Sequence, residues 1–354
     1  MKIFHNIYIA FIVLILSGIF FCFALFSYGM SSTSHDNSLN QVEISPGSID
    51  SIANTLKKEN FIRSKFCFKV YVKLTNKTNL KAGIYSLSKD MGIKKIVDIL
   101  ENGKNSGNIK ITFKEGLNMR NIVKTITENT NNTEEMVYEV LNNKEYLTEL
   151  ISKYWFLTED ILNNDIYYSL EGYLYPSTYY FHSKETKVTT IFETMLDELE
   201  NQLDSYKEEI SSQNYTIHEI LTLASIVELE GITEEDRKNI ASVFYNRLDK
   251  NMNLGSDVTT YYSLKIDIGT VSDNELDLYQ CNNYNTRCAT FKKLPISPIC
   301  NPSLESISAV LHPNNNDYLY FVADKNKKVY YSKTSQEHNN KINQLKKEGL
   351  WYNN

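Results

Sequence analysis

The chain has 354 residues, with 37 Lys and Arg against 43 Asp and Glu and a formal net charge of −6. This acidic balance, without a basic stripe, excludes a typical nucleic-acid-binding protein. A hydrophobic content of 42% excludes a disordered chain, and the length suits one membrane segment and roughly two domains.

The N-terminal segment is strongly apolar. Residues 7–28 carry no charge and consist mainly of Ile, Phe, Leu, Val and Ala, which matches the roughly 20 residues needed to cross a bilayer. A signal peptide is the alternative, but it has a shorter apolar core and a small-residue cleavage site that is not evident here. Lys2 precedes the segment and residues 31–40 hold no Lys or Arg. We therefore predict a cytoplasmic tail over 1–6, a transmembrane helix over 7–28 and a body outside the cytoplasm.

A polar linker over 29–40 leads to a small α/β module over 41–108. Strands are predicted at 42–44 and 80–87, and apolar residues at helical spacing predict helices at 49–56 and 93–100. A mixed α+β domain follows over 109–348, before a C-terminal tail over 349–354. The fold class is therefore α+β.

The larger domain opens with a strand at 109–113 and a helical stripe at 119–126. Helical patterns continue over 133–162 and 189–206. Thr216 and Glu219 have the spacing of a capping box and mark the start of another helix, and Thr233 caps the next. After a loop-rich stretch over 253–303, the pattern indicates two strands at 318–323 and 329–332 and a last helix from Gln336.

The most informative residue of this domain is Glu228, which follows the apolar run 221–227. On a helix it shares a face with Leu221, Ala224 and Ser225, none of which carries a countercharge. Loss of solvation on such a face should raise the pKa of Glu228, so that it could act as an acid near neutral pH. The alternative is that the helix ends there and Glu228 simply reaches water.

A second carboxylate on the same helix does not complete a catalytic pair. Glu230 lies two residues on, roughly 200° around the helix from Glu228, so the two cannot flank one substrate. We expect Glu230 at the surface or in a supporting role. Asp257 is the nearby carboxylate with freedom to reach the site, although it could equally be a turn residue.

The five cysteines do not predict a metal site. Cys281, Cys288 and Cys300 cluster, and the first two could form a disulfide in an oxidising compartment. Their spacing with His312 fits no structural zinc site. No nucleotide-binding or serine-hydrolase motif is present either. We therefore expect no metal and no cofactor.

Several motifs in one order resemble the endolytic murein transglycosylases, the YceG-like family. The resemblance spans residues 42–348 and rests on Ala82-Gly83, Glu115-Gly116, residues 170–179, Ala224 to Glu230, Ile240 to Leu248, Ser256-Asp257, Tyr284-Asn285-Thr286, residues 298–302, residues 320–323 and Glu337-His338-Asn339.

That resemblance implies a mechanism suited to a lone acid. Glu228 would protonate the glycosidic oxygen between N-acetylmuramic acid and N-acetylglucosamine, and would then take the proton of the muramoyl C6 hydroxyl as a 1,6-anhydro ring closes. It further implies a LysM-like fold for the 41–108 module, glycan strands as the substrate and cell-wall synthases as partners. The expected role is to end glycan elongation.

Other site residues are predicted from their chemistry. Amide, hydroxyl and carboxylate groups suit sugars, which makes Asn246, Asp257, Thr259 and Asn285 candidates for substrate contacts. A capping or structural role is the alternative for each of them. Arg247 is expected to support a loop through a carboxylate such as Asp257 or Glu337.

The chain departs from the family pattern at Arg287, where an aromatic residue is common, and at Ile296-Ser297, where Pro-Gly is usual. These departures leave two alternatives open. One is a membrane protein without catalytic activity that binds glycan or docks on a synthase, and the other is a true peptidoglycan hydrolase in which Asp257 activates water.

Overall fold

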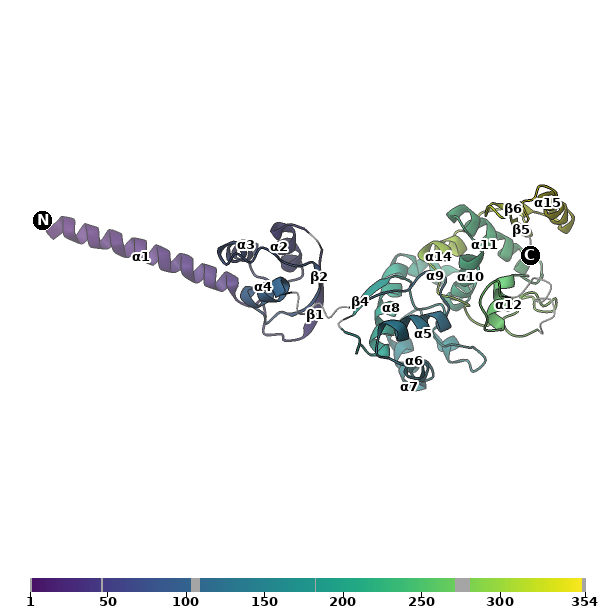
Figure 1. Ribbon diagram of the computed structural model, residues 1–354, viewed down its shortest axis with the longest axis horizontal. Helices are drawn as coiled ribbons and strands as arrows, with labels where there is room; N and C mark the ends of the chain where they lie inside the picture. Colours follow the sequence, from purple (N-terminus) through teal and green to yellow (C-terminus); the bar gives the residue numbers. More distant parts are fainter. Residues whose placement is uncertain (1, 46, 103–108, 182, 271–280, 352–354) are drawn as a thin grey trace. The chain divides into compact units, whose positions relative to one another are not determined.

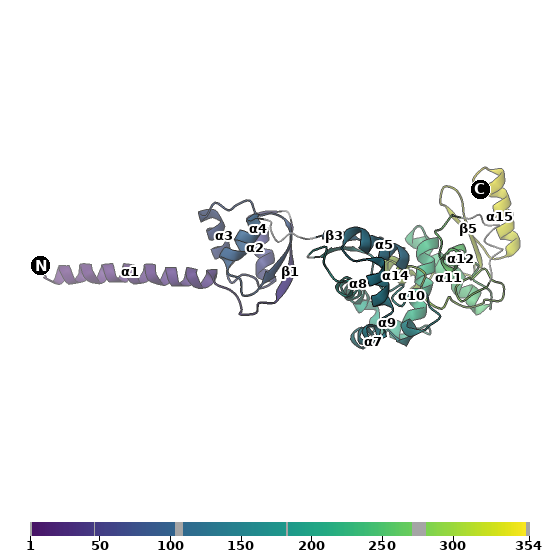
Figure 2. The same ribbon diagram turned by 60° about the horizontal axis from the view of Figure 1, so that its bottom comes forward.

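The computed structural model describes residues 2–45, 47–102, 109–181, 183–270 and 281–351, with the backbone alone for residues 2–12, 15, 19 and 180. The chain divides into two compact units. The first comprises residues 1–110 and 180–184, and the second comprises residues 111–179 and 185–354 (Figure 1, Figure 2).

Helix α1 (Lys2–Met30) opens the first unit and includes the helix predicted over residues 7–28. Within the described residues, no helix combines the length and apolar character of a membrane span. The C-terminal end of α1 is anchored in its own unit. Phe26 and Met30 pack on the core of that unit, and Arg63 donates a hydrogen bond of 2.9 Å to the Tyr28 hydroxyl.

A two-stranded antiparallel sheet and three short helices complete the first unit. Strand β1 (Leu39–Ile44) pairs antiparallel with β2 (Gly83–Ser88), in a register running from Leu39 opposite Ser88 to Ile44 opposite Gly83. The helices are α2 (Ile49–Lys58), α3 (Lys65–Leu74) and α4 (Ile93–Asn102). The predicted stripe of α2 is buried, because Ile52, Ala53 and Leu56 all lie in the core. No prediction covered α3.

The second unit is mainly helical. Strand β3 (Ile109–Thr112) pairs with β4 (Thr178–Phe181), and residues 111–112 and 178–179 of these strands belong to this unit. Strand β5 (Tyr320–Ala323) forms an antiparallel hairpin with β6 (Val329–Ser332). The helices are α5 (Met119–Asn129), α6 (Glu134–Leu141), α7 (Lys144–Lys153), η1 (Glu159–Leu162), α8 (Val188–Leu203), η2 (Asp204–Tyr206), α9 (Lys207–Ser212), α10 (Ile217–Glu230), α11 (Glu234–Asp249), α12 (Asp257–Ser263), α14 (Leu304–Leu311) and α15 (Ser335–Lys347). The predicted α+β class is confirmed.

Helix α10 lies at the centre of this unit. It is apolar on every side and is buried from Leu221 to Val227, as expected for a helix enclosed by other elements. Helices α11 and α14 pack on it and on each other, and α12 also contacts it. The capping box predicted from Thr216 and Glu219 is present and fixes the start of α10.

One element of the second unit was missed. The chain between residues 253 and 303 was expected to be loop-rich, but residues 257–263 form helix α12. Asp257 is therefore the first residue of a helix and not a turn residue. Helix α12 places Asp257 and Ser256, the residue before it, beside the end of α10.

Candidate active site

The end of α10 carries two carboxylates with different surroundings. The helix stops at Glu230, and Gly231 follows with its N–H bonded to the carbonyl of Val227 at 2.8 Å. A Cβ atom at residue 231 would lie 2.5 Å from Cγ of Arg237 and 3.2 Å from its Cα. Glycine is therefore needed here because α11 passes so close to the end of α10.

Glu228 is held by hydrogen bonds from the start of α14. Its Oε2 accepts the Ser303 N–H at 2.9 Å, the Ser303 hydroxyl at 2.5 Å and the Ser306 hydroxyl at 2.7 Å. Oε1 faces the Arg237 guanidinium at 3.6 Å, and only 7% of the Glu228 side chain is exposed. The residues that share the helix face of Glu228 carry no countercharge, as predicted, but Arg237 of α11 supplies one from outside that face.

Glu230 has a sparser set of partners. Its Oε1 accepts a hydrogen bond of 2.6 Å from the Ser256 hydroxyl, which lies just before α12. Burial raises the pKa of Glu230 to about 7. The Ser256 hydrogen bond lowers this pKa, the negative charge of Asp257 raises it and Arg247 lowers it. A carboxyl group with this pKa can both donate and accept a proton near neutral pH.

Asp257 is the residue that the hydrolase alternative would use to activate water. Its side chain is 41% exposed. Arg287 forms an ion pair with it through Nη1 and Oδ1. Arg287 is one of the positions where this chain departs from the family pattern. The departure therefore places a positive charge against Asp257, whose own charge acts on Glu230.

The other predicted sugar contacts have partners within the protein. Asn246 donates from Nδ2 to the carbonyls of Asn316 and Tyr318, at 2.9 and 3.0 Å. Thr259 is fully buried, and its hydroxyl bonds the Ser256 carbonyl and the Thr286 hydroxyl. Asn285 is 2% exposed and accepts hydrogen bonds from the Thr260 hydroxyl and the Arg287 N–H. These contacts favour the structural alternative for all three residues.

Arg247 does support loops, but through carbonyl oxygens. Its Nε donates to the Leu319 carbonyl at 2.6 Å, and its Nη1 donates to the Leu254 carbonyl at 2.6 Å. The expected carboxylate partners are therefore wrong. Glu337 instead completes the capping box of α15 with Thr334.

A further buried carboxylate, Glu171, was not among the predicted site residues and is only 1% exposed. It accepts hydrogen bonds from the Met119 N–H at 2.9 Å, the Tyr262 hydroxyl at 3.0 Å and the Asn301 amide at 3.2 Å. Burial raises the pKa of Glu171 to about 8, against the lowering effect of these hydrogen bonds and of Arg120. The sequence did carry a signal for this residue, because Glu171 is a single acid between Leu170 and the apolar residues 173–174.

The cysteines are partly oxidised. Cys281 and Cys288 form a disulfide with Cα atoms 5.4 Å apart, while Cys300 is a buried thiol that donates to the Ser225 carbonyl at 3.2 Å. Within the described residues, no group of three or more His, Cys, Asp or Glu side chains has the arrangement of a metal site.

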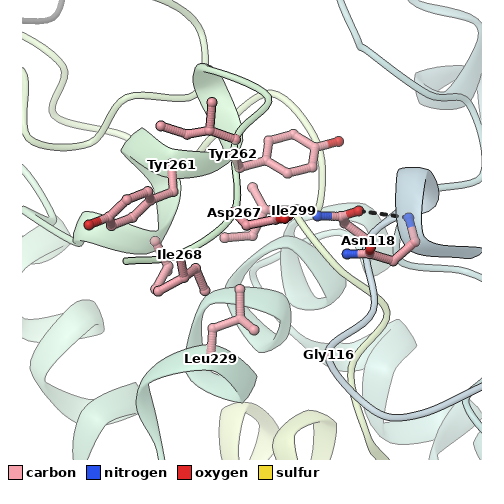
Figure 3. A pocket seen from close by; sticks show the side chains of 11 residues that line it. Gly116, Asn118, Leu229, Tyr261, Tyr262, Asp267, Ile268 and Ile299 are labelled. Atoms are coloured by element: carbon pink, nitrogen blue, oxygen red, sulfur yellow. Dashed lines mark hydrogen bonds between the residues drawn. The ribbon is translucent and has the colours of Figure 1, made fainter. Parts of the chain in front are cut away.

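A small cavity adjoins the end of α10 and the start of α12. Leu229 of α10 and Val258 of α12 line it, together with residues of α5, of the segment after α12 and of the segment before α14 (Figure 3). Its volume is about 120 Å³. The acid and the cavity are therefore built from the same two helix ends.

The fold and the site define an α+β protein in which one buried helix carries two acidic side chains at its end. The model of the YceG-like family matches residues 42–344, so the chain belongs to that family, and the resemblance expected from the motifs is confirmed.

The chain is also similar to two curated proteins and to one solved structure. The endolytic murein transglycosylase of Bacillus subtilis strain 168 is 36% identical over 298 residues, which are 83% of this chain and 81% of that protein. The enzyme of the same name from Streptococcus pneumoniae serotype 2 strain D39 is 31% identical over 312 residues, 83% of this chain and 56% of that protein. The crystal structure of a YceG-like protein from Listeria monocytogenes is 37% identical, with a TM-score of 0.62, and the match covers 86% of this chain and 99% of that chain.

Proposed function

We propose that this chain is an endolytic murein transglycosylase, a lyase that cuts peptidoglycan glycan strands internally and leaves 1,6-anhydro-N-acetylmuramic acid ends. Family membership and the names of its relatives support the activity. The observation that carries the mechanism is the half-buried Glu230, with a pKa near 7 and a hydroxyl partner from a different helix.

The reaction needs one group that first gives and then takes a proton. In our proposal the protonated Glu230 donates its proton to the glycosidic oxygen, and the bond between that oxygen and the anomeric carbon breaks. The muramoyl C6 hydroxyl then bonds to the anomeric carbon and returns its proton to the Glu230 carboxylate. No water is consumed and Glu230 ends in its starting state. Such acid–base catalysis contributes about 10²- to 10⁴-fold to the rate.

We assign the proton transfer to Glu230 rather than to Glu228, which was the residue predicted from the sequence. Three hydrogen bonds hold Oε2 of Glu228, and the Arg237 guanidinium lies 3.6 Å from Oε1, so this carboxylate is tied to α11 and α14. This network favours a structural role for Glu228, which joins the three helices. Glu230 accepts the Ser256 hydrogen bond on Oε1, and within the described residues no hydrogen bond reaches Oε2, the oxygen that we assign to the glycosidic bond.

Glu230→Gln and Glu228→Gln form a matched pair that tests this assignment. The full-length protein is incubated with uncrosslinked glycan strands, and the products are identified by mass spectrometry. We expect wild type to release anhydro ends and Glu230→Gln to lose at least about 10²-fold in rate, since general acid–base catalysis is removed. Glu228→Gln, when folded, should retain more activity than Glu230→Gln.

Other outcomes would exclude the proposal in defined ways. Reducing ends would indicate a hydrolase, with Asp257 as the group that activates water. An absence of cleavage by folded wild type would indicate a protein that only binds glycan or docks on a synthase. Activity lost only in Glu228→Gln would return the acid to the residue predicted from the sequence.

The location and partners form the remaining part of the proposal. The uncharged stretch over residues 7–28 supports a single-pass anchor, and the disulfide between Cys281 and Cys288 supports a catalytic unit outside the reducing cytoplasm. In this setting the 41–108 module would be LysM-like and the enzyme would work beside cell-wall synthases to end glycan elongation. Cell fractionation checks the anchor. The full chain should sediment with membranes and a chain lacking residues 2–28 should not; a full chain in the soluble fraction would contradict it.

A further inference from the structure

The cavity that adjoins the end of α10 has a mixed lining, which includes Leu229, the residue before Glu230. Apolar side chains of Leu229, Val258, Ile266, Ile268 and Ile299 line it, together with Tyr261, Tyr262 and the polar residues Asn118, Asn121 and Asp267 (Figure 3). Asn118 uses its Oδ1 to accept the Asn121 N–H at 3.1 Å and so caps α5. Within the described residues, its Nδ2 donor has no acceptor. The cavity thus offers an amide donor next to an apolar surface.

The walls of the cavity are held in place by hydrogen bonds. After α12 the N–H of Ile266 bonds the Tyr261 carbonyl at 3.2 Å, and Arg120 of α5 donates to the Ile266 carbonyl at 3.2 Å. Gly116, which also lines the cavity, has a φ of +74°, and a Cβ atom there would lie 3.3 Å from a methyl carbon of Leu229. The cavity therefore depends on a glycine and on a tethered loop, which is the preorganisation expected of a binding site.

The volume of the cavity and the charge of its lining indicate which chemical group could bind there. Sites for drug-sized ligands have volumes of about 300 to 1,000 Å³. At about 120 Å³ this cavity takes one substituent of a sugar and not a whole ring with its neighbours. The carboxylate of Asp267 lines it and disfavours an anionic group such as a lactyl or peptide carboxylate.

We propose that this cavity is a subsite for the acetamido group of an N-acetylated sugar in the strand that Glu230 cuts. The methyl group packs on the walls formed by Leu229, Val258 and Ile268, and the amide carbonyl accepts a hydrogen bond from Nδ2 of Asn118. The amide N–H donates to the Asp267 carboxylate. This inference rests on the proposed function, and it names the chemical feature by which the site distinguishes murein from glycans with plain hydroxyls.

The test measures binding without cleavage. The full-length chain carrying Glu230→Gln, in mild detergent, is titrated with chitotetraose and with cellotetraose, which differ only in the acetamido or hydroxyl group at C2. We expect chitotetraose to bind about tenfold more tightly, the effect of about 1.4 kcal/mol from one well-placed group. Equal affinities, or chitotetraose binding weaker than a Kd of about 10 mM, would overturn the inference.

Two tryptophan variants test whether the preference for chitotetraose arises at this cavity. Ile268 lines the cavity and is 57% exposed, so Ile268→Trp should fill the cavity without disturbing the core. We expect this variant to lose the preference for chitotetraose. The control Met136→Trp, at a position of α6 that is 46% exposed and outside the cavity, should keep it. An unchanged preference in Ile268→Trp would refute the subsite.

The two proposals can fail separately. If Glu230→Gln still releases anhydro ends while the Ile268→Trp effect holds, the subsite stands and the acid assignment fails. If Glu230→Gln abolishes cleavage while Ile268→Trp keeps the preference, the acid stands and the subsite fails.

Discussion

Glu228 and Glu230 lie two residues apart on one helix, and their roles are set by the elements that reach them. Serines of α14 and an arginine of α11 surround Glu228, whereas Ser256 before α12 contacts Glu230. Sequence periodicity could place Glu228 on a helix face and could exclude the two residues as an opposed pair. It could not show which distant residues meet each carboxylate, and for this reason Glu230 was expected to have only a supporting role.

The neighbours of Glu230 predict two opposite shifts of the pH profile. Because Glu230 must start protonated, the proposed reaction should slow above about pH 7. Ser256→Ala removes the hydrogen bond that lowers the pKa of Glu230, so the alkaline limb should move to higher pH. Asp257→Asn removes a negative charge that raises this pKa, so the limb should move to lower pH. The measurement is kcat/KM for glycan cleavage between pH 5 and pH 9.

The direction of each shift is the informative readout, because either variant could also lower the rate at its optimum. Shifts in the same direction, or a limb that neither variant moves, would remove Glu230 from the proton transfer.

At the scale of elements, the sequence predicts helices well where the local signals agree. The capping box at Thr216 and the apolar run behind it mark α10 without any tertiary information. Helix α12 was missed because residues 257–263 are rich in Val, Thr and Tyr, which are weak helix formers. Most of its residues are buried, so packing rather than local propensity stabilises this helix.

Ser303 links α14 to α10, so its replacement should destabilise the protein more than the loss of an ordinary helix cap. Ser303 caps α14 by accepting the Ser306 N–H at 3.3 Å, and its hydroxyl also donates to Glu228. Ser303→Ala removes both contacts. We expect a loss of about 2 to 4 kcal/mol in the free energy of unfolding, the sum of a cap and a charged hydrogen bond.

Thr133→Ala is the matched control. Thr133 caps α6 by accepting the Met136 N–H, and its surroundings are exposed. This variant should lose about 1 kcal/mol, as for an ordinary cap. Both losses are measured by urea unfolding followed by tryptophan fluorescence, and equal losses would show that the tie to Glu228 adds nothing.

At the scale of the whole molecule, the two units can be observed separately. Both tryptophans, Trp155 and Trp351, belong to the unit formed by residues 111–179 and 185–354. Tryptophan fluorescence therefore follows the unfolding of that unit. The same unit holds Glu171 and Glu230, whose pKa values are raised to about 8 and about 7 by burial.

Glu171 makes the stability of this unit depend on pH. Its pKa is about 8 in the folded chain against an ordinary value of 4.5. Between these values the unfolded chain releases a proton that the folded chain retains, so the unfolded state binds fewer protons and the free energy of unfolding falls as pH rises. The contribution is complete below about pH 4.5 and is lost by about pH 8. Glu171→Gln cannot titrate, so the fall between pH 5 and pH 8 should be smaller in this variant than in wild type.

The measurement is the urea midpoint of tryptophan fluorescence at pH 5, 6, 7 and 8. Glu145→Gln, on the exposed side of α7, is the control and should follow the wild-type curve. The remaining slope in Glu171→Gln should come largely from Glu230 and should decrease further in the double variant with Glu230→Gln. If Glu171→Gln keeps the full wild-type slope, Glu171 is not the proton-binding group, and the link that it makes between α5, α12 and Asn301 is a purely structural one.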